Sequence, residues 1–512
     1  MTTAGEGKSS RNTQLRRTLS LLGAIAISIG LMAPSMAANI TPQATAGIVG
    51  RAVPLAFVLA LVTVAFVAHS FIRLTQHFHH AGSVYGFVGA TLGPRAGVVA
   101  GWALAGTYVL FAAITVAAAG IFTGTFLGDV GIWHDPPGWA PFAIVPFVLV
   151  LVWAFALFSA RQATRTVLCF EGVTVTLIVV VAVIVLVKVI AHQTPGGQHF
   201  TLSVFEPEPG TDFGTIFKGA IFGFLAFAGF EAAGTLGEET RQPRRNIPRA
   251  IFGVVLLGGV YFVLVTAVEV LGFGTGSQGV TAFVNSGSLL GDLSSTYVGS
   301  PLGDIITAGT AISAFACALA STVAASRLVY AFGRDGLGPR ALSRTSRRTA
   351  TPTVALAVVG ALTVIVIYAL RLGGVSDAFN IFAWGGTIGT LTLIVAYALA
   401  ALGVARLYAT GRHRRGYRWE AVIPVAALVL LGFTMYYNLE FTTDSGPGFW
   451  NPVIAGIWVV LGIAIVVAWP GVGRRVGDRL LAEDGLTSAS DETVEDQPHA
   501  QLAGGHESVV TE

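Results

Sequence analysis

The chain has 512 residues, of which 54% are hydrophobic and only 11% carry a charged side chain. No soluble domain of this size needs so much apolar surface, so the composition excludes a soluble globular protein and indicates a polytopic membrane protein. The formal net charge of +3 says little about partners. The two cysteines, Cys169 and Cys317, lie in apolar stretches without metal-binding spacing, so we expect buried thiols and neither a disulfide nor a zinc site.

In chain order, twelve apolar segments are long enough to cross roughly 30 Å of hydrocarbon. They span residues 19–39, 52–73, 97–127, 140–159, 167–190, 213–236, 250–274, 303–332, 353–371, 377–405, 420–438 and 449–470. We therefore predict an all-α polytopic membrane protein with twelve transmembrane helices.

The remaining residues define the domain organisation. Residues 1–17 form a polar, basic N-terminus, and residues 18–405 contain the first ten segments. Residues 406–470 contain segments eleven and twelve. Residues 471–512 are acidic, contain Ser and Thr and hold too little apolar surface to fold alone, so we expect a disordered cytoplasmic tail.

The distribution of basic residues predicts the orientation. The loops opposite the N-terminus offer only Arg51 and Arg371, with Lys188 and Lys218 at segment edges. Basic loops stay on the cytoplasmic side, so both termini are predicted to be cytoplasmic in a multi-pass protein of the cell membrane. The basic residues predicted on the cytoplasmic side include Lys8, Arg11, Arg16, Arg17, Arg73, Arg95, Arg161, Arg165, Arg241, Arg244, Arg245, Arg249, Arg334, Arg340, Arg406, Arg412, Arg474 and Arg475.

The stretch "RRTLSLLGAIAISIGLMAPSMA" allows a second interpretation. Its basic start, apolar run and small residues before a possible cut after Ala37 also fit a secretory signal. The orientation rule does not decide between the two, because the second segment keeps its orientation either way. We expect the first segment to be retained, because it matches a segment in the second half of the chain.

Two segments in matching positions contain residues that interrupt helices. The first carries Gly30, Pro34 and Ser35 within "SIGLMAPS", and the sixth carries Gly229 within "FAGFE". Proline lacks an N–H and clashes with the preceding turn, and unpaired backbone in hydrocarbon costs several kcal/mol. Such breaks therefore persist only where they face a cavity or a ligand. Two of them, five segments apart, indicate an inverted-repeat transporter with segments 1–5 and 6–10 as its halves; a simple packed kink is the alternative for either one.

Three stretches resemble the amino acid–polyamine–organocation (APC) permeases: "AGSVYGFVGATLGPRAGVVAGW" (81–102), "FAGFEAAGTLGEETRQPRRNIPRA" (227–250) and "SRLVYAFGRDGLGP" (326–339). The resemblance covers about residues 15–470. It implies a LeuT-like five-plus-five inverted repeat, with helices 1 and 6 broken and two extra C-terminal helices. It also implies secondary transport of amino acids or related amines, and a first segment that is retained as half of the site.

The first segment departs from the pattern of the family. Many relatives have a Gly-Ser/Ala-Gly break there, whereas this chain has Ser28-Ile29-Gly30 followed by Ala33-Pro34-Ser35. The resemblance therefore does not define the shape of the carboxylate pocket or the substrate.

A broken helix offers two kinds of site to an amino acid. A half-helix that begins after a break has unpaired N–H groups and the positive end of a dipole, which suit a carboxylate. A half-helix that ends at a break exposes carbonyls, which suit an ammonium group. Aromatic residues could wall the pocket, although each is individually more often a packing residue. The candidates for substrate binding are Ser28, Gly30, Ala33, Pro34 and Ser35 for the carboxylate, Phe227, Ala228 and Gly229 for the ammonium group, and Phe227, Phe230, Tyr108, Phe111 and Trp384 for the walls.

Glu231 is a lone acid deep inside the sixth segment, directly after the break. A carboxyl at that depth is costly unless it is protonated or paired. A group that is neutral in one conformation and ionised in another can couple proton movement to opening, and the resemblance implies a role in pH response or gating at this position. The alternative is a structural acid that bonds the freed backbone of the broken helix.

Four further polar residues are candidates for coupling or gating. Glu171 is expected to lie shallowly inside the cytoplasmic face, within reach of an arginine. Some relatives carry a lysine in segment five that substitutes for sodium, but our alignment places Thr174 there. Ser321 and Thr322 in segment eight could offer oxygens to a cation, although hydroxyls more often bond their own helix. Sodium coupling is therefore open but not favoured.

No nucleophile–base pair or nucleic-acid patch is present in the sequence, so we predict neither an enzyme nor a nucleic-acid partner. "GTGSQG" (274–279) lacks the strand–turn–helix context of a dinucleotide site, so no cofactor is expected. "HFHH" (77–80) lacks nearby acids or cysteines, so no metal is expected either. The leading hypothesis is an amino acid permease coupled to protons, in the lipid bilayer and of undefined oligomeric state. The alternatives are an amine, polyamine or amino acid exchanger and, in a different class, a membrane nutrient sensor that binds without transporting.

Overall fold

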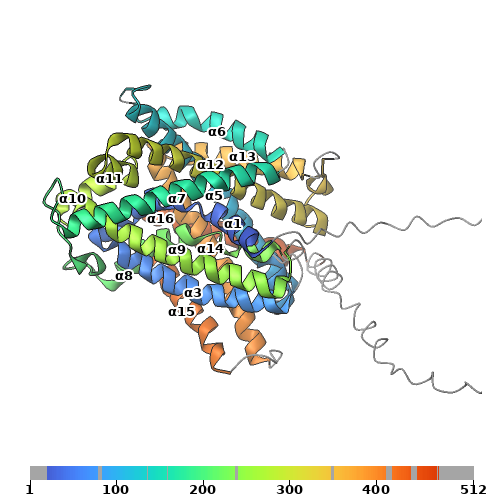
Figure 1. Ribbon diagram of the computed structural model, residues 1–512. Helices are drawn as coiled ribbons and strands as arrows, with labels where there is room; N and C mark the ends of the chain where they lie inside the picture. The colour runs from blue at the N-terminus through green and yellow to red at the C-terminus, as the bar shows by residue number, and fades with distance from the viewer. Residues whose placement is uncertain are drawn as a thin grey trace, which may run out of the picture.

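The computed structural model describes residues 20–78, 84–134, 136–157, 160–236, 240–346, 351–410, 418–439, 447–469 and 471 (Figure 1). Every regular element within these ranges is a helix, which confirms the all-α prediction. The α-helices are α1 (Leu21–Met32), α2 (Pro34–Val49), α3 (Val53–His77), α4 (Val84–Leu92), α5 (Pro94–Asp129), α6 (Ala140–Leu157), α7 (Ala160–Ile190), α8 (Phe213–Phe227), α9 (Pro243–Phe273), α10 (Ser277–Val284), α11 (Leu289–Tyr297), α12 (Ser300–Asp335), α13 (Thr353–Leu372), α14 (Ala378–Ala409), α15 (Val422–Asn438) and α16 (Pro447–Ala468). Between them lie the 3-10 helices η1 (Gly50–Ala52), η2 (Leu202–Phe205), η3 (Phe230–Leu236), η4 (Arg340–Ser343) and η5 (Arg418–Ala421).

Within the described ranges, nine helical stretches are long and apolar enough to cross a membrane. One of them, Leu21–His77, contains both the first and the second predicted segments, because α1 to α3 follow one another without a long loop. The sixth and eleventh predicted segments correspond to the shorter apolar helices Phe213–Phe227 and Val422–Asn438. The multi-pass class is confirmed, whereas twelve crossings stay a prediction. Residues 1–17 and 472–512 lie outside the described residues.

The first predicted break lies at Ala33. This residue has φ 45° and ψ 62°, between the end of α1 at Met32 and the start of α2 at Pro34. The left-handed conformation is costly for a residue with a Cβ. Pro34 explains its position, because proline breaks a helix interior but is tolerated at the first position of a new helix. Gly30, which the sequence predicts as part of the break, lies inside α1.

The second break lies at Gly229, as predicted. α8 ends at Phe227, Ala228 has ψ 132°, and Gly229 has φ 110° before η3 begins. Glycine adopts this φ without the steric cost that a side chain would add. The chain can therefore leave α8 and enter η3 at this residue without a longer loop.

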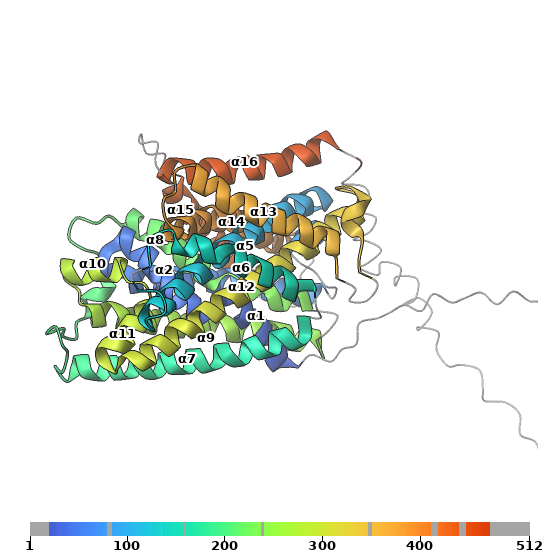
Figure 2. The same cartoon turned by 90° about the horizontal axis from the view of Figure 1, so that it is seen from above.

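The interrupted helices lie among long helices that are buried along most of their length. α1 packs against η3 and α2 packs against α8, so the two breaks lie together. α5 packs along both α12 and α14, and α3 packs along α9. Figure 2 shows α7 and α16 at opposite edges of this bundle. The polar groups at the breaks are thus surrounded by protein.

The outer helices expose large apolar side chains, as expected for a surface that faces lipid. Cys169 on α7 is also exposed, while Cys317 on α12 is buried. The expectation of two buried thiols is therefore wrong for Cys169, because an apolar sequence does not distinguish a lipid-facing surface from a protein core. Exposed apolar residues include Phe147, Val150 and Trp153 on α6, Val179, Val183 and Val187 on α7, Leu257 and Leu264 on α9, and Ile457 and Val460 on α16.

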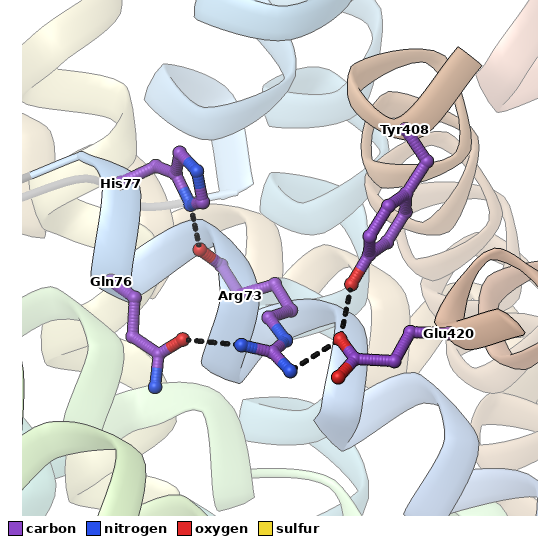
Figure 3. Close-up of polar contacts among 5 residues, drawn as sticks. All are labelled: Arg73, Gln76, His77, Tyr408 and Glu420. Atoms are coloured by element: carbon purple, nitrogen blue, oxygen red, sulfur yellow. Dashed lines mark hydrogen bonds and ion pairs between the residues drawn. The ribbon is translucent and has the colours of Figure 1, made fainter. Parts of the chain in front are cut away.

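A polar cluster joins three elements at the end of the bundle where α3 finishes (Figure 3). Arg73 on α3 forms an ion pair with Glu420 in η5 and donates a hydrogen bond to Gln76 (3.2 Å). The Tyr408 hydroxyl at the end of α14 donates to Glu420 (2.9 Å). The imidazole of His77 lies 2.9 Å from the carbonyl of Arg73. Glu420 therefore connects the segment before α15 to both α3 and α14.

We expect Glu420→Ala to destabilise the protein, because it leaves a mostly buried arginine and a tyrosine each short of a partner. The expected loss is about 1–3 kcal/mol, the usual cost of removing one partner of a buried polar group. The measurement is the unfolding temperature of the purified protein in detergent. Glu206→Ala, at an exposed carboxylate in the loop before α8, is the matched control and should change little. Equal unfolding temperatures for the two variants would contradict a stabilising role for the cluster.

Candidate functional site

The backbones of the two breaks are in direct contact. A Cβ added to Gly229 would lie 3.0 Å from the Cβ of Leu31 at the end of α1. Ser28 joins the same elements, because its hydroxyl donates to the carbonyl of Phe230 (3.3 Å) and accepts from the N–H of Ala233 (3.0 Å). The ends of α1, α2, α8 and η3 therefore meet in one place, which is the arrangement that the candidate substrate site requires.

The start of α2 is occupied by side chains of neighbouring helices. The N–H of Ser35 donates to a carboxylate oxygen of Glu171 on α7 (2.8 Å), and the N–H of Met36 donates to the hydroxyl of Ser313 on α12 (3.2 Å). Pro34 has no N–H. The predicted carboxylate-binding end of the half-helix thus already holds a carboxylate, which belongs to the protein itself.

Glu171 lies deeper than the sequence suggested. Its side chain is 4% exposed, because α7 begins at Ala160, well before the predicted segment. Its partners are the N–H of Ser35 and the hydroxyls of Ser313 and Ser35, and no described arginine. The side chains of Arg161 and Arg165 lie outside the described residues. Glu171 therefore stabilises the first break from a buried position.

The carbonyls next to the first break also receive donors. The thiol of Cys317 on α12 donates to the carbonyl of Leu31 (3.1 Å), and the hydroxyl of Tyr261 on α9 donates to the carbonyl of Pro34 (3.4 Å). A backbone interruption inside a membrane protein needs such partners, since no water is available in hydrocarbon. The buried backbone at Ala33 is thus supported from α7, α9 and α12.

Glu231 organises the second break. One carboxylate oxygen accepts from the hydroxyl of Tyr108 on α5 (3.1 Å). The other accepts from the hydroxyl of Tyr397 on α14 (2.8 Å) and from the N–H of Gly229 (3.0 Å). Glu231 is 3% exposed, so this carboxyl links α5, α14 and the interrupted backbone in the interior. Both interpretations of Glu231, structural and coupling, are compatible with these contacts.

Two of the predicted wall residues, Phe227 and Phe230, flank the second break. The ring of Phe227 packs edge-to-face on Phe262 of α9, with centroids 5.4 Å apart. The ring of Phe230 contacts Phe71 of α3 (5.6 Å) and Tyr397 of α14 (5.5 Å). Both side chains are fully buried, so they hold η3 and the end of α8 against the surrounding helices.

Two further predicted wall residues, Phe111 on α5 and Trp384 on α14, make packing contacts. The ring of Phe111 packs against Gly389, where an added Cβ would lie 2.9 Å from it. Trp384 is partly buried against the hydrophobic core. These contacts assign packing roles to Phe111 and Trp384 in this conformation.

The predicted cation ligands do not converge on one point. The hydroxyl of Thr174 donates to its own helix at the Phe170 carbonyl (3.0 Å), and that of Thr322 donates to Ala318 (2.7 Å). The hydroxyl of Ser321 is buried beside the thiol of Cys317. In the same ranges, no group of three His, Cys, Asp or Glu side chains is placed to hold a metal ion. Two histidines of "HFHH", at positions 79 and 80, lie outside the described residues.

The middle of α2 is held to the segment that joins α10 and α11 and to the first turn of α11. The amide oxygen of Asn39 accepts from the N–H of Leu290 (2.9 Å), and the amide nitrogen of Gln43 donates to the carbonyl of Ser286 (2.8 Å). The hydroxyl of Ser286 donates to Asp292 (2.6 Å). Burial raises the pKa of Asp292, which this hydrogen bond lowers in part. Movement of α2 must therefore move this segment or break its bonds.

Sequence reasoning missed several polar residues of the site. Tyr397, Ser313, Cys317 and Asn39 contact Glu231 or the residues beside the first break. Glu269 on α9 is also fully buried, but neither of its carboxylate oxygens bonds a described residue, so it is not part of this site. The signal that could have found them is a polar side chain in the middle of an apolar segment, where it is costly unless it has a partner. Which partner each one takes depends on helix packing and was not readable from the chain.

Comparison with known proteins identifies relatives that are membrane transporters. The sequence model described as "Amino acid permease" matches residues 20–480. The branched-chain amino acid permease BcaP of Lactococcus lactis is 25% identical over 462 residues, which cover 87% of this chain and 92% of that protein. The low-affinity putrescine importer PlaP of Escherichia coli is 27% identical over 357 residues, covering 69% of this chain and 75% of that protein. Among solved structures, the manganese transporter of Eremococcus coleocola superposes with a TM-score of 0.54 at 12% identity, over 91% of this chain and 99% of that one, and shows likeness in fold alone.

We expect Gly229→Ala to destabilise the second break. The added Cβ meets Leu31 at 3.0 Å, and φ 110° is strained for alanine, so the expected cost is about 1–3 kcal/mol. The measurement is the unfolding temperature in detergent. Gly47→Ala is the matched control: Gly47 lies in α2 with open space around it, and alanine favours helix by about 1 kcal/mol. A Gly229→Ala protein as stable as the Gly47→Ala protein would show that the break tolerates a side chain.

Proposed function

Because this chain belongs to the amino acid permease family, whose members are transporters and not enzymes, we propose that it moves amino acids across the cytoplasmic membrane by alternating access. The observation that carries the proposal is the contact between the two helix breaks, at Ala33 and Gly229. Both breaks leave helix ends inside a bundle of apolar helices. Those ends offer N–H groups and carbonyls to a small zwitterion.

The substrate carboxylate is assigned to the start of α2 and the ammonium group to the end of α8. The N–H groups of Ser35 and Met36 point to acceptors there already, which supports an anion-binding role for this helix end. The end of α8 at Phe227 to Gly229 carries the negative end of its dipole, which favours an ammonium group. At the start of α2, the substrate carboxylate would replace the protein's own partners.

The transporter is proposed to have twelve spans, of which the first ten form two inverted halves of five, with both termini in the cytoplasm. Helices in equivalent positions of the two halves pack against one another, namely α3 with α9 and α5 with α12. The contacts of α1 with η3 and of α2 with α8 support an interface between the halves at the interrupted spans. Such an interface is where substrate sites of inverted-repeat transporters lie.

Coupling to protons is assigned to Glu231. Its carboxylate accepts from two phenols and one backbone N–H, and these donors lie on α5, α14 and the break. Protonation would remove the charge that holds the three donors together and would loosen the second break. The break and its coupling group are thus part of one hydrogen-bond network.

Transport of amines is a second candidate function. Two buried acids, Glu171 and Glu231, lie at the breaks, and a buried carboxylate attracts an ammonium group. The similarity to a putrescine importer favours the same substrate class. This candidate includes an exchanger, which moves one amine or amino acid inward for another outward and does not need an ion gradient.

Uptake into proteoliposomes tests these candidates together. The full chain is reconstituted and offered labelled amino acids and amines, with and without an inward proton gradient. Uptake that is driven by the gradient supports proton coupling, whereas uptake that requires only internal substrate supports exchange. Binding of a substrate without flux in either direction would support a sensor and contradict transport.

We expect Glu231→Gln to flatten the pH dependence of transport. Glutamine has nearly the same shape but does not take up a proton in the relevant range, so the rate should vary less than about twofold between pH 5 and pH 8 if this group carries the coupling. The measurement is the initial uptake rate against pH, at equal amounts of reconstituted protein. Tyr397→Phe is the control, since it removes one donor to Glu231 and keeps the carboxyl. An unchanged pH profile in Glu231→Gln would remove Glu231 from coupling.

A further inference from the structure

The first residues of α2 form a helix end whose N–H groups are all accounted for. Pro34 has none, Ser35 donates to Glu171, and Met36 donates to Ser313. The N–H of Ala37 donates to the Ala33 carbonyl, as in a regular helix. Because α2 has 16 residues, its N-terminus carries the partial positive charge that anions bind. The anion in this place is the side chain of Glu171.

Glu171 has no cationic partner among the described side chains. α1, α2 and α6 contain no Asp, Glu, Lys, Arg or His. The ionisable groups nearest to Glu171 are Tyr261 and Glu269 on α9 and Cys317 on α12. None of these side chains is a cation. The charge of an ionised Glu171 is therefore balanced mainly by the N-terminus of α2.

A second polar group of Ser35 lies at the same helix end. The hydroxyl of Ser35 is fully buried beside the Glu171 carboxylate and makes no hydrogen bond of normal geometry to a described residue. Buried hydroxyls are normally bonded, so this donor is poorly satisfied while Glu171 is in place. The start of α2 therefore offers a carboxylate both the N–H and the hydroxyl of Ser35.

We propose that Glu171 is a specificity-determining residue that holds the carboxylate site of α2 when no substrate is bound and that the carboxylate of an amino acid must displace. This inference rests on the proposed substrate site at the two breaks. The carboxylate of Glu171 and that of an amino acid are chemically alike and require the same Ser35 N–H. Two carboxylates at hydrogen-bonding distance also repel one another. An amine without a carboxylate does not compete for this N–H and leaves Glu171 in place.

The test compares substrates that differ only in the carboxylate. The probes are L-leucine with isoamylamine and L-ornithine with putrescine, each titrated against the purified full chain in detergent at pH 7. We expect Glu171→Ala to bind the amino acid of a pair about tenfold more tightly than the wild type, as expected when a competing charge-assisted hydrogen bond is removed. Binding of the matching amine should change less than about twofold.

A conservative variant and a control extend the test. Glu171→Gln keeps an oxygen for the Ser35 N–H but loses the charge, so its effect should be in the same direction and about threefold. Glu269→Gln removes a different buried carboxylate, on α9, and should leave amino acid binding unchanged. The proposal would be overturned if both Glu171 variants bound the amino acid no more tightly than the wild type. It would also be overturned if Glu269→Gln tightened amino acid binding as much as the Glu171 variants do, or if the affinity for the amine changed as much as that for the amino acid.

A second readout does not depend on the identity of the substrate. If the start of α2 is a carboxylate site, millimolar acetate should raise the unfolding temperature of Glu171→Ala and leave those of the wild type and Glu269→Gln unchanged, relative to chloride. Failure of acetate to stabilise Glu171→Ala would overturn the inference even where the chain transports amino acids. Stabilisation by acetate in a chain that moves none of the four probes would support the inference and contradict the proposed function.

Discussion

The structure depends on one constraint: backbone N–H and carbonyl groups that leave a helix inside the membrane must find partners within the protein. Each unpaired group costs several kcal/mol in hydrocarbon. The break at Ala33 is satisfied by Glu171, Ser313, Cys317 and Tyr261, which lie on α7, α12 and α9. The break at Gly229 is satisfied by Glu231, whose carboxylate also binds two tyrosines. The interruptions persist because neighbouring helices complete them.

The same contacts connect stability to transport. The groups that complete the breaks in this conformation are carboxylates, hydroxyls and a thiol, which are the kinds of group that a substrate or a proton can replace. The breaks touch one another at Leu31 and Gly229, so a substrate bound at the proposed site would have to separate them. Binding would then replace intramolecular hydrogen bonds by hydrogen bonds to the substrate. The difference in free energy between these two sets of bonds would decide which substrates bind.

Further contacts between the helices restrict how the helices move. At one end of the bundle, Asn39 and Gln43 hold α2 to the segment between α10 and α11. At the end where α3 finishes, Arg73 and Glu420 hold α3 to the element that precedes α15. In the proposed alternating access, a half-helix that moves against these anchored neighbours would have to break and re-form these bonds.

The sequence by itself determined the class, the number of apolar segments and the position of both interruptions. The apolar segments can be read directly from the order of residues along the chain. Pro34 and Gly229 interrupt a helix through local backbone geometry alone. The depth and partners of the polar residues were decided only by the tertiary structure. Glu171 was expected near the surface but lies on the start of α2, and Tyr397 was not recognised as a partner of Glu231. These contacts join residues far apart in the chain, and they depend on the rotation and register of packed helices, which an apolar segment does not specify.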